Sequence, residues 1–200
     1  MHLTRMMKSI GYRLLFLHLG LFLFISESNA EHIAFHFNPA QTQIHWKLRE
    51  NFHTVRGTLT LNGGLLALNT ATGDAQGEIL VDIGTLQSGN SKRDASIKQE
   101  VLDADKYPQA FFHPTHVSGA LKEGAGQQLN LSGAFNIHGA DHPLTVTAWI
   151  DKSGNQANVK ARFKLPYVDW GMKRPSGFLW KADKEVEIEI VSHASVEVVP

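Results

Sequence analysis

The 200-residue sequence contains no cysteine. Disulfide-stapled folds, thiolate metal sites, iron–sulfur clusters and cysteine nucleophiles are therefore excluded. The sequence also lacks a basic surplus, because 19 lysine and arginine residues balance 19 aspartate and glutamate residues. Proteins that bind the phosphate backbone of nucleic acids need such a surplus, so we expect no nucleic-acid partner.

Familiar catalytic motifs are missing as well. No serine stands in the Gly-x-Ser-x-Gly frame of a nucleophile elbow, and no His-Glu-x-x-His zinc motif occurs. Gly124 and Gly126 are not followed by a helical pattern, so they do not resemble a phosphate-binding loop. A pair of catalytic carboxylates leaves no signature in a single sequence, but nothing favours one. We therefore expect a binding protein that is not an enzyme.

The one long apolar run lies close to the N-terminus. Three basic residues precede this run, which covers residues 14–25, and Ser28 and Ala30 then supply the small residues that signal peptidase recognises. This order predicts a cleavable signal peptide over residues 1–30. Because 12 residues are too few to cross about 30 Å of hydrocarbon, we expect no stable membrane insertion after cleavage. In a Gram-negative cell, residues 31–200 would form one periplasmic domain.

After residue 30, apolar and polar residues alternate with a period of two, which is typical of half-buried β-strands. Eight stretches show this alternation. They lie near residues 43–49, 55–62, 75–83, 110–117, 127–137, 142–151, 159–165 and 186–198. Turn-forming residues separate several of them, namely Asn62-Gly63-Gly64, Gly139-Ala140-Asp141 and Ser153-Gly154-Asn155.

One segment departs from the strand pattern. Ile97, Val101 and Leu102 share one face of a helix among charged residues, which predicts a short, broken helix within residues 90–105 that covers the sheet or one end of it. Short connections favour antiparallel pairing of the eight strands. The expected fold is all-β, either a closed barrel or a sandwich. The barrel is slightly favoured because closure removes unpaired strand edges and leaves room for a small ligand.

Four short motifs occur in order along the mature chain. They are Arg56-Gly57 after Val55; the spaced set Gly89-Asn90, Arg93-Asp94, Asp103, Lys106-Tyr107-Pro108 and Phe112; Phe135-Asn136-Ile137-His138-Gly139 with Pro143; and Val168-Asp169-Trp170-Gly171-Met172. With these motifs, residues 37–190 resemble the YceI-like family of secreted, lipocalin-like proteins that bind polyisoprenoids or similar long-chain lipids.

The sequence departs from that family in three places. Ser96 stands where relatives often carry histidine or lysine, and Val101-Leu102 replaces a usual aromatic pair. Residues 173–184 form a variant segment to which the resemblance assigns no role. These differences leave open whether the cavity keeps the shape it has in relatives.

The resemblance implies an eight-stranded antiparallel lipocalin-like barrel with a short covering helical segment, no catalysis, and no cofactor other than a bound lipid. The ligand would be a polyprenol, an isoprenoid quinone, or a fatty acid or amide, held in an apolar barrel cavity for carriage or storage. A homodimer is a further expectation, because relatives are often dimeric. The residues expected to line the cavity, each of which also fits ordinary core packing, are Trp46, Leu59, Leu61, Ile79, Val81, Phe112, Phe135, Ile137, Val146, Ile150, Phe163 and Ile188.

Three polar residues are candidates for contacts with the head group of the lipid, namely Arg93, Asp94 and Tyr107. A structural alternative exists for each of them. Arg93 and Asp94 suit a capped helical turn with an ion-pair network that fixes the covering segment. Tyr107 precedes Pro108, whose fixed φ suits a turn into the next strand.

Histidines suggest an alternative function as a periplasmic metal or stress-response accessory protein. His113 with His116, and His138 with His142, have spacings that resemble metal-binding pairs. Residues i and i+3 of a strand point to opposite faces, however, and no cysteine assists them, so we expect no metal site. A third option is a partner-binding barrel whose interior is filled by its own side chains.

Overall fold

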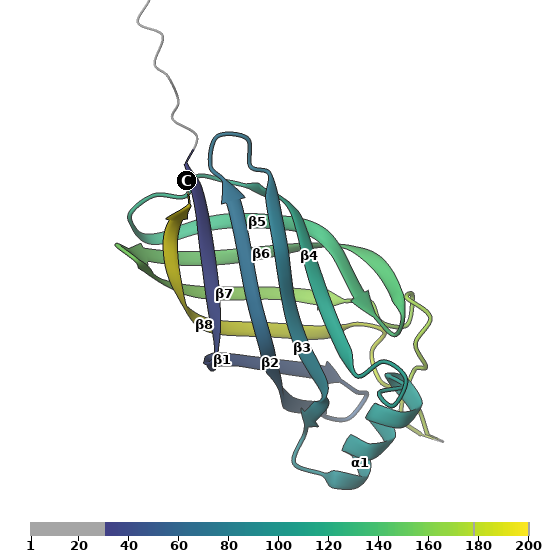
Figure 1. Ribbon diagram of the computed structural model, residues 1–200. Helices are drawn as coiled ribbons and strands as arrows, with labels where there is room; N and C mark the ends of the chain where they lie inside the picture. Colours follow the sequence, from purple (N-terminus) through teal and green to yellow (C-terminus); the bar gives the residue numbers. More distant parts are fainter. Residues whose placement is uncertain (1–30, 178, 200) are drawn as a thin grey trace, which may run out of the picture.

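The computed structural model describes residues 31–177 and 179–199. The predicted signal peptide, residues 1–30, lies outside the described residues. The described chain forms eight antiparallel strands that close into a barrel in chain order, β8 pairing with β1 (Figure 1). The prediction of an eight-stranded antiparallel barrel is confirmed, and the sandwich alternative is wrong.

Each strand pairs with its neighbour in the chain. The strands are β1 (His32–Arg49), β2 (Thr54–Asn69), β3 (Ala75–Gln87), β4 (Gln109–Ser118), β5 (Gly124–Ile137), β6 (Ala140–Ser153), β7 (Gln156–Leu165) and β8 (Val186–Val199). Buried and exposed residues alternate along most of them, because successive side chains point into and out of the barrel.

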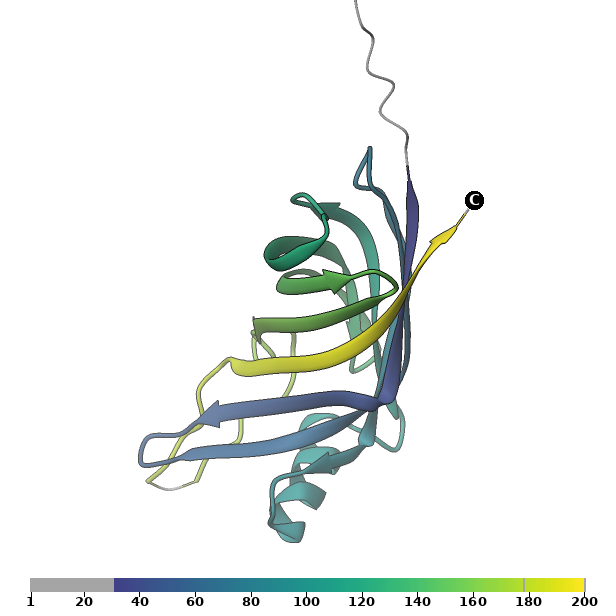
Figure 2. The ribbon, with the colours of Figure 1, turned by 90° about the vertical axis from the view of Figure 1, so that its left-hand side faces the viewer.

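The predicted helix is confirmed as a short two-part segment between β3 and β4. It consists of the α-helix α1 (Ser91–Ser96) and the π-helical turn η1 (Ile97–Val101). Asn90 caps α1, because its side-chain oxygen accepts a hydrogen bond from the backbone N–H of Arg93 at 3.1 Å. The segment lies across one end of the barrel (Figure 2).

One predicted turn is wrong. β2 does not end at Asn62-Gly63-Gly64 but continues to Asn69, and β1 begins at His32, well before the start that alternation predicted. The pairing of β2 with β3 shifts register between Leu61 and Gly63, and Gly63 has a φ of 151°. Such a bulge bends and twists a strand without ending it. The long strands give the barrel depth.

One end of the barrel carries the C-terminus (Figure 1). Side chains fill the interior at this end. Phe35 from β1 and Leu129 from β5 are only 1% and 2% exposed, and Leu66 and Val196 are buried beside them in the core. The ring of Phe37 stacks on that of Phe35, with 6.5 Å between the ring centroids. This region is the closed end.

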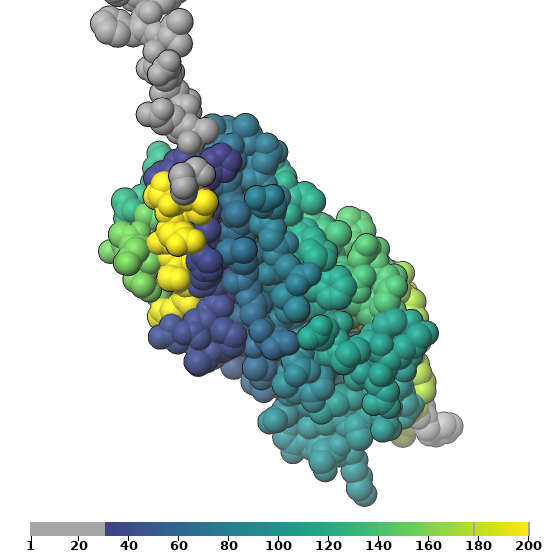
Figure 3. Space-filling model, in the orientation of Figure 1, coloured from purple at the N-terminus to yellow at the C-terminus, as the bar shows by residue number. Residues whose placement is uncertain are grey.

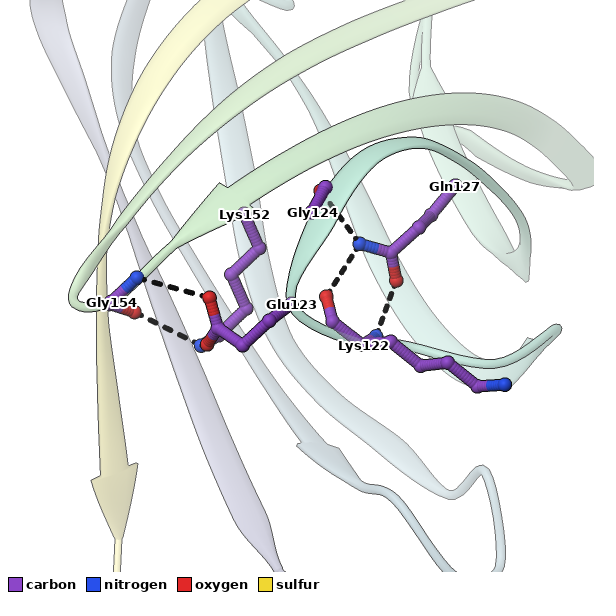
Figure 4. A network of polar contacts seen from close by, with 6 residues as sticks. All are labelled: Lys122, Glu123, Gly124, Gln127, Lys152 and Gly154. Carbon is purple, nitrogen blue, oxygen red and sulfur yellow. Dashed lines mark hydrogen bonds and ion pairs between the residues drawn. The ribbon is translucent and has the colours of Figure 1, made fainter.

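Polar contacts tie two loops together at the closed end (Figure 4). Glu123, which precedes β5, accepts hydrogen bonds from the ammonium of Lys152 and from the backbone N–H of Gly154, the latter at 3.1 Å. Lys152 also donates to the carbonyl of Gly154 at 2.9 Å, and the amide of Gln127 donates to the carbonyl of Gly124 at 3.0 Å. The β4–β5 connection is thereby fixed to the β6–β7 hairpin.

The opposite end of the barrel is built differently, and we call it the mouth. Three segments gather there: the α1–η1 segment, the β1–β2 connection, and residues 166–185 between β7 and β8 (Figure 2). In the space-filling view, the helical segment protrudes at this end, away from the C-terminus (Figure 3). Within the described residues, no helix combines the length and the apolar character needed to span a bilayer.

Candidate functional site

The middle of the barrel contains an apolar cavity of about 140 Å³. All eight strands contribute inward side chains to its wall. Small residues are part of the reason that space remains, because Ala110, Ala148 and Ala161 occupy inward positions among larger aliphatic and aromatic side chains. An apolar cavity of about 150 Å³ is large enough for a benzene-sized guest and stays dry when empty.

A second apolar cavity of about 100 Å³ lies between the barrel and the mouth segments. Trp46, Val101 from η1 and Met172 from the β7–β8 connection contribute to its wall. It shares wall residues with the barrel cavity, namely Leu59, Ile83, Ile137, Leu165 and Ile188. The two cavities therefore follow one another toward the mouth.

A wider groove of about 700 Å³ opens at the mouth. It shares Leu48, Ile97, Val101 and Pro175 with the second cavity. The three spaces thus form a series from the surface to the middle of the barrel.

Charged residues occur along this series only at the mouth groove. Arg93, Lys173, Glu50 and Glu100 line the groove, whereas no charged residue lines either inner cavity within the described chain. Lys173 donates a hydrogen bond to Glu100, which lowers the pKa of that carboxyl group. The interior suits a neutral hydrocarbon, and a charged or polar head would remain at the groove.

Trp46 and Tyr167 turn only apolar atoms toward the second cavity. The indole N–H of Trp46 is buried and has no hydrogen-bond partner among the described residues. The hydroxyl of Tyr167 donates to the carbonyl of Asp183 at 2.7 Å, and burial raises the pKa of Tyr167 to about 12.

The structure brings most of the predicted lining residues together. Trp46 lines the second cavity, while Ile150 is buried on β6 and belongs to neither wall. The other ten predicted residues line the barrel cavity; they are Leu59, Leu61, Ile79, Val81, Phe112, Phe135, Ile137, Val146, Phe163 and Ile188. That these side chains contact a ligand stays a prediction.

The predicted head-group residues do not form one cluster. Arg93 lines the mouth groove, but its guanidinium also donates to the hydroxyl and carbonyl oxygens of Ser88 at 2.8 and 2.9 Å. Asp94 accepts a hydrogen bond from the hydroxyl of the same serine and lines none of the described cavities. These contacts fit the structural alternative, in which the two residues hold α1 in place.

Tyr107 also lies away from the cavities. Its ring packs so closely over Gly139 that a Cβ there would come within 2.3 Å of it. The ring of His138 packs tilted against the ring of Tyr107, with 5.2 Å between the ring centroids. The ammonium of Lys106 lies 4.8 Å from the centroid of the same tyrosine ring. Tyr107 thus packs against the β5–β6 turn, a contact that neither interpretation of this residue from the sequence described.

Sequence analysis missed the contribution of the β7–β8 connection. Met172 and Pro175 line the inner cavity nearest the mouth, and Pro175, Leu179 and Trp180 line the groove. The available signal was a run of apolar and aromatic residues without strand alternation inside the variant segment 173–184. Alternation cannot detect such residues, because they reach the site from a connection and not from a strand.

Two of the histidines in the predicted metal-binding pairs are engaged in other contacts. His113 lies 3.5 Å from the carboxylate of Glu78, and the ring of His142 stacks on Trp170 at a centroid distance of 4.3 Å. Among residues 31–177 and 179–199, no three potential metal ligands come together as a group.

Comparison with known proteins is consistent with this architecture. The YceI-like domain family matches residues 35–194. A UPF0312 protein of Pseudomonas putida strain W619 is 28% identical over 156 residues, which cover 73% of this chain and 79% of the relative. A UPF0312 protein of Vibrio campbellii is 26% identical over 152 residues, which cover 74% of this chain and 68% of the relative.

Solved structures share the fold at low sequence identity. BcnA of Burkholderia cenocepacia superimposes with a TM-score of 0.63 at 14% identity, covering 78% of this chain and 98% of BcnA. A protein described as a polyisoprenoid binding domain from Saccharophagus degradans superimposes with a TM-score of 0.58 at 12% identity, covering 82% of this chain and 98% of that chain.

Proposed function

Because the chain belongs to the YceI-like domain family, we propose that it is a non-enzymatic periplasmic protein that binds an isoprenoid or related acyl lipid. The lipid chain occupies the inner cavities, and its head lies at the mouth groove. The protein carries or stores this lipid after its signal peptide is removed.

The single observation that carries this proposal is a series of apolar spaces with charge confined to the outer one. If about 150 Å³ accommodates six carbon atoms, the two inner cavities accommodate about ten. Each buried methylene contributes about 0.8 kcal/mol, from which the ordering of the chain must be subtracted. Ten carbons therefore contribute about 8 kcal/mol before that subtraction, and a longer chain would extend into the groove.

The class of lipid is supported by two further points. A protein of the same fold from Saccharophagus degradans is described as a polyisoprenoid binding domain. The cavity wall here offers mainly aliphatic and aromatic surface, to which branched isoprene units and straight acyl chains are both suited. Polyprenols and isoprenoid quinones combine such a chain with a compact polar head.

Mass spectrometry of solvent extracts tests this function. The protein is purified from its native host after secretion, extracted with organic solvent, and then offered a polyprenol or an isoprenoid quinone. We expect about one lipid per barrel. In Ala161→Phe, the new ring would occupy the barrel cavity, so lipid uptake should be lost.

The matched control is Asn158→Phe, which places the same side chain on an exposed position of the same strand. It should bind lipid as the wild type does. A lipid-free extract from the wild type, together with no uptake of either offered lipid, would overturn the proposed function.

A further inference from the structure

The two most exposed large apolar side chains among the described residues lie at the mouth. Phe52 in the β1–β2 connection is 76% exposed and Leu179 in the β7–β8 connection is 72% exposed. Trp180, which is 37% exposed, lies next to Leu179, and all three side chains line the mouth groove. We call these three residues the apolar lip.

Hydrogen bonds connect the two segments that carry the lip. The backbone N–H of Asp183 donates to the carbonyl of Arg49 at 2.8 Å, and Glu50 forms an isolated antiparallel bridge with Ala182. A backbone hydrogen bond of 2.9 Å from Gly177 to Trp180 closes the turn that presents Leu179. Segments that are far apart in the sequence are thereby held at one edge of the groove.

The surroundings of the lip carry positive charge. Residues 173–184 contain four basic residues and one acidic residue, a net charge of +3. The whole chain beyond residue 30 contains 16 basic and 18 acidic residues, a net charge of −2. Lys181 and Lys184 are exposed and make none of the ion pairs found among the described residues. The positive charge is therefore a local feature of the segment that carries Leu179 and Trp180.

Exposed aromatic and aliphatic side chains flanked by lysines are typical of surfaces that insert shallowly into anionic membranes. Among the other exposed apolar side chains, Leu65 and Trp149 lie on the strand walls, and Val198, which is 63% exposed, lies at the end of β8 opposite the mouth. A bilayer surface fits the lip better than a small ligand does, because Phe52 and Leu179 point large apolar areas into solvent beside an open groove.

We propose that the apolar lip docks the mouth of the barrel onto a bilayer that contains anionic phospholipids, so that lipids pass between the membrane and the barrel without crossing water. The passage of lipid rests on the proposed function, whereas docking itself does not. Phe52, Leu179 and Trp180 insert between the head groups, and Lys181 and Lys184 attract the phosphates.

Vesicle flotation tests the docking. The secreted protein is mixed with vesicles of phosphatidylethanolamine and phosphatidylglycerol, and in parallel with vesicles of phosphatidylcholine alone. We expect association with the anionic vesicles that weakens as salt is added. Phe52→Ser and Leu179→Ser should each lower vesicle affinity about tenfold, because each removes one inserted apolar side chain. Lys181→Glu combined with Lys184→Glu should lower it at least as much, but only for anionic vesicles.

The matched control is Leu65→Ser, which removes an exposed leucine from the strand wall and should leave vesicle affinity unchanged. Ala161→Phe should dock normally and fail to take up lipid, which separates docking from the proposed function. The docking proposal is overturned if the wild type does not float with anionic vesicles, or if the lip variants float as well as the wild type does.

Discussion

The two ends of this barrel are made by the same strands but are filled differently. At the closed end, large side chains such as Phe35, Leu66 and Leu129 fill the interior, and the Glu123–Lys152 network ties the loops above them. Toward the mouth, alanines at inward positions leave apolar space, and the loops expose Phe52 and Leu179 as well as a Lys173–Glu100 ion pair. The comparison indicates that one end stabilises the fold, whereas the other is where the proposed function places the lipid.

The largest expected difference between the two regions is in the free energy of unfolding lost when a phenylalanine is replaced by alanine. Phe35→Ala at the closed end should lower the free energy of unfolding by about 3–5 kcal/mol, because it opens a void in a packed region. Phe163→Ala should cost less than half as much, since this half-buried ring already borders a cavity. Urea unfolding monitored by circular dichroism gives both values. Equal losses would contradict the distinction between the two regions.

Substitution of Gly57, a glycine near the mouth, should lower stability nearly as much as Phe35→Ala does. A Cβ at Gly57 would lie 2.0 Å from the carbonyl oxygen of Gln87 and 2.5 Å from the ring of Trp46. Gly57→Ala should therefore displace the indole, lower stability by about 1–3 kcal/mol and weaken lipid binding.

Gly154→Ala is the control for this substitution, because a Cβ there meets no atom within 4 Å. Its φ of 56° makes alanine unfavourable, so some stability is lost, but lipid binding should be unchanged. Comparing lipid affinity in the two variants distinguishes displacement of the Trp46 indole in the cavity wall from a general loss of stability. Weakened binding in both would contradict the specific role of the Trp46 wall.

Tyr167 should show a smaller effect that depends on pH. Its hydroxyl anchors Asp183, so Tyr167→Phe should cost about 1 kcal/mol at neutral pH. Burial raises the pKa of the folded Tyr167 to about 12, above that of the unfolded chain. The protonated hydroxyl therefore stabilises the fold below pH about 10, and this contribution is lost as pH rises toward about 12. Chemical unfolding across this window should show the decline in the wild type and not in Tyr167→Phe.

The smallest effect is expected at the exposed Glu123 network. The hydrogen bond from Lys152 lowers the pKa of Glu123, so its stabilising contribution is present above the ordinary pKa of a glutamate and is lost as pH falls through the lowered value. Glu123→Gln should lower the melting temperature slightly at neutral pH. In strong acid the two proteins should melt together, and a difference that persists there would argue against an ionic contribution.

Alternation predicted the strands well because inward and outward side chains must differ in a half-buried sheet. It failed at Gly63, where a turn was predicted and the structure has a bulge. The bulge follows from the register between β2 and β3, which local sequence does not encode. Alternation also cannot distinguish inward residues that line a cavity from inward residues that pack in the core. Ile150 and Phe135 have the same pattern, but only Phe135 borders the cavity, because Ile150 pairs with Gln127 near the closed end whereas Phe135 pairs with His142 nearer the mouth. The lip was missed because connections have no periodicity.

The central claim is that vacant apolar space inside the barrel receives a hydrocarbon chain from the mouth. Titration calorimetry with a series of straight-chain alcohols of increasing length tests it most directly. Affinity should rise steeply with each added carbon up to about ten, the capacity of the inner cavities, and more slowly beyond that length. Ala161→Phe should shift this break to shorter chains. An affinity that does not depend on chain length, with the same values in Ala161→Phe, would contradict the account.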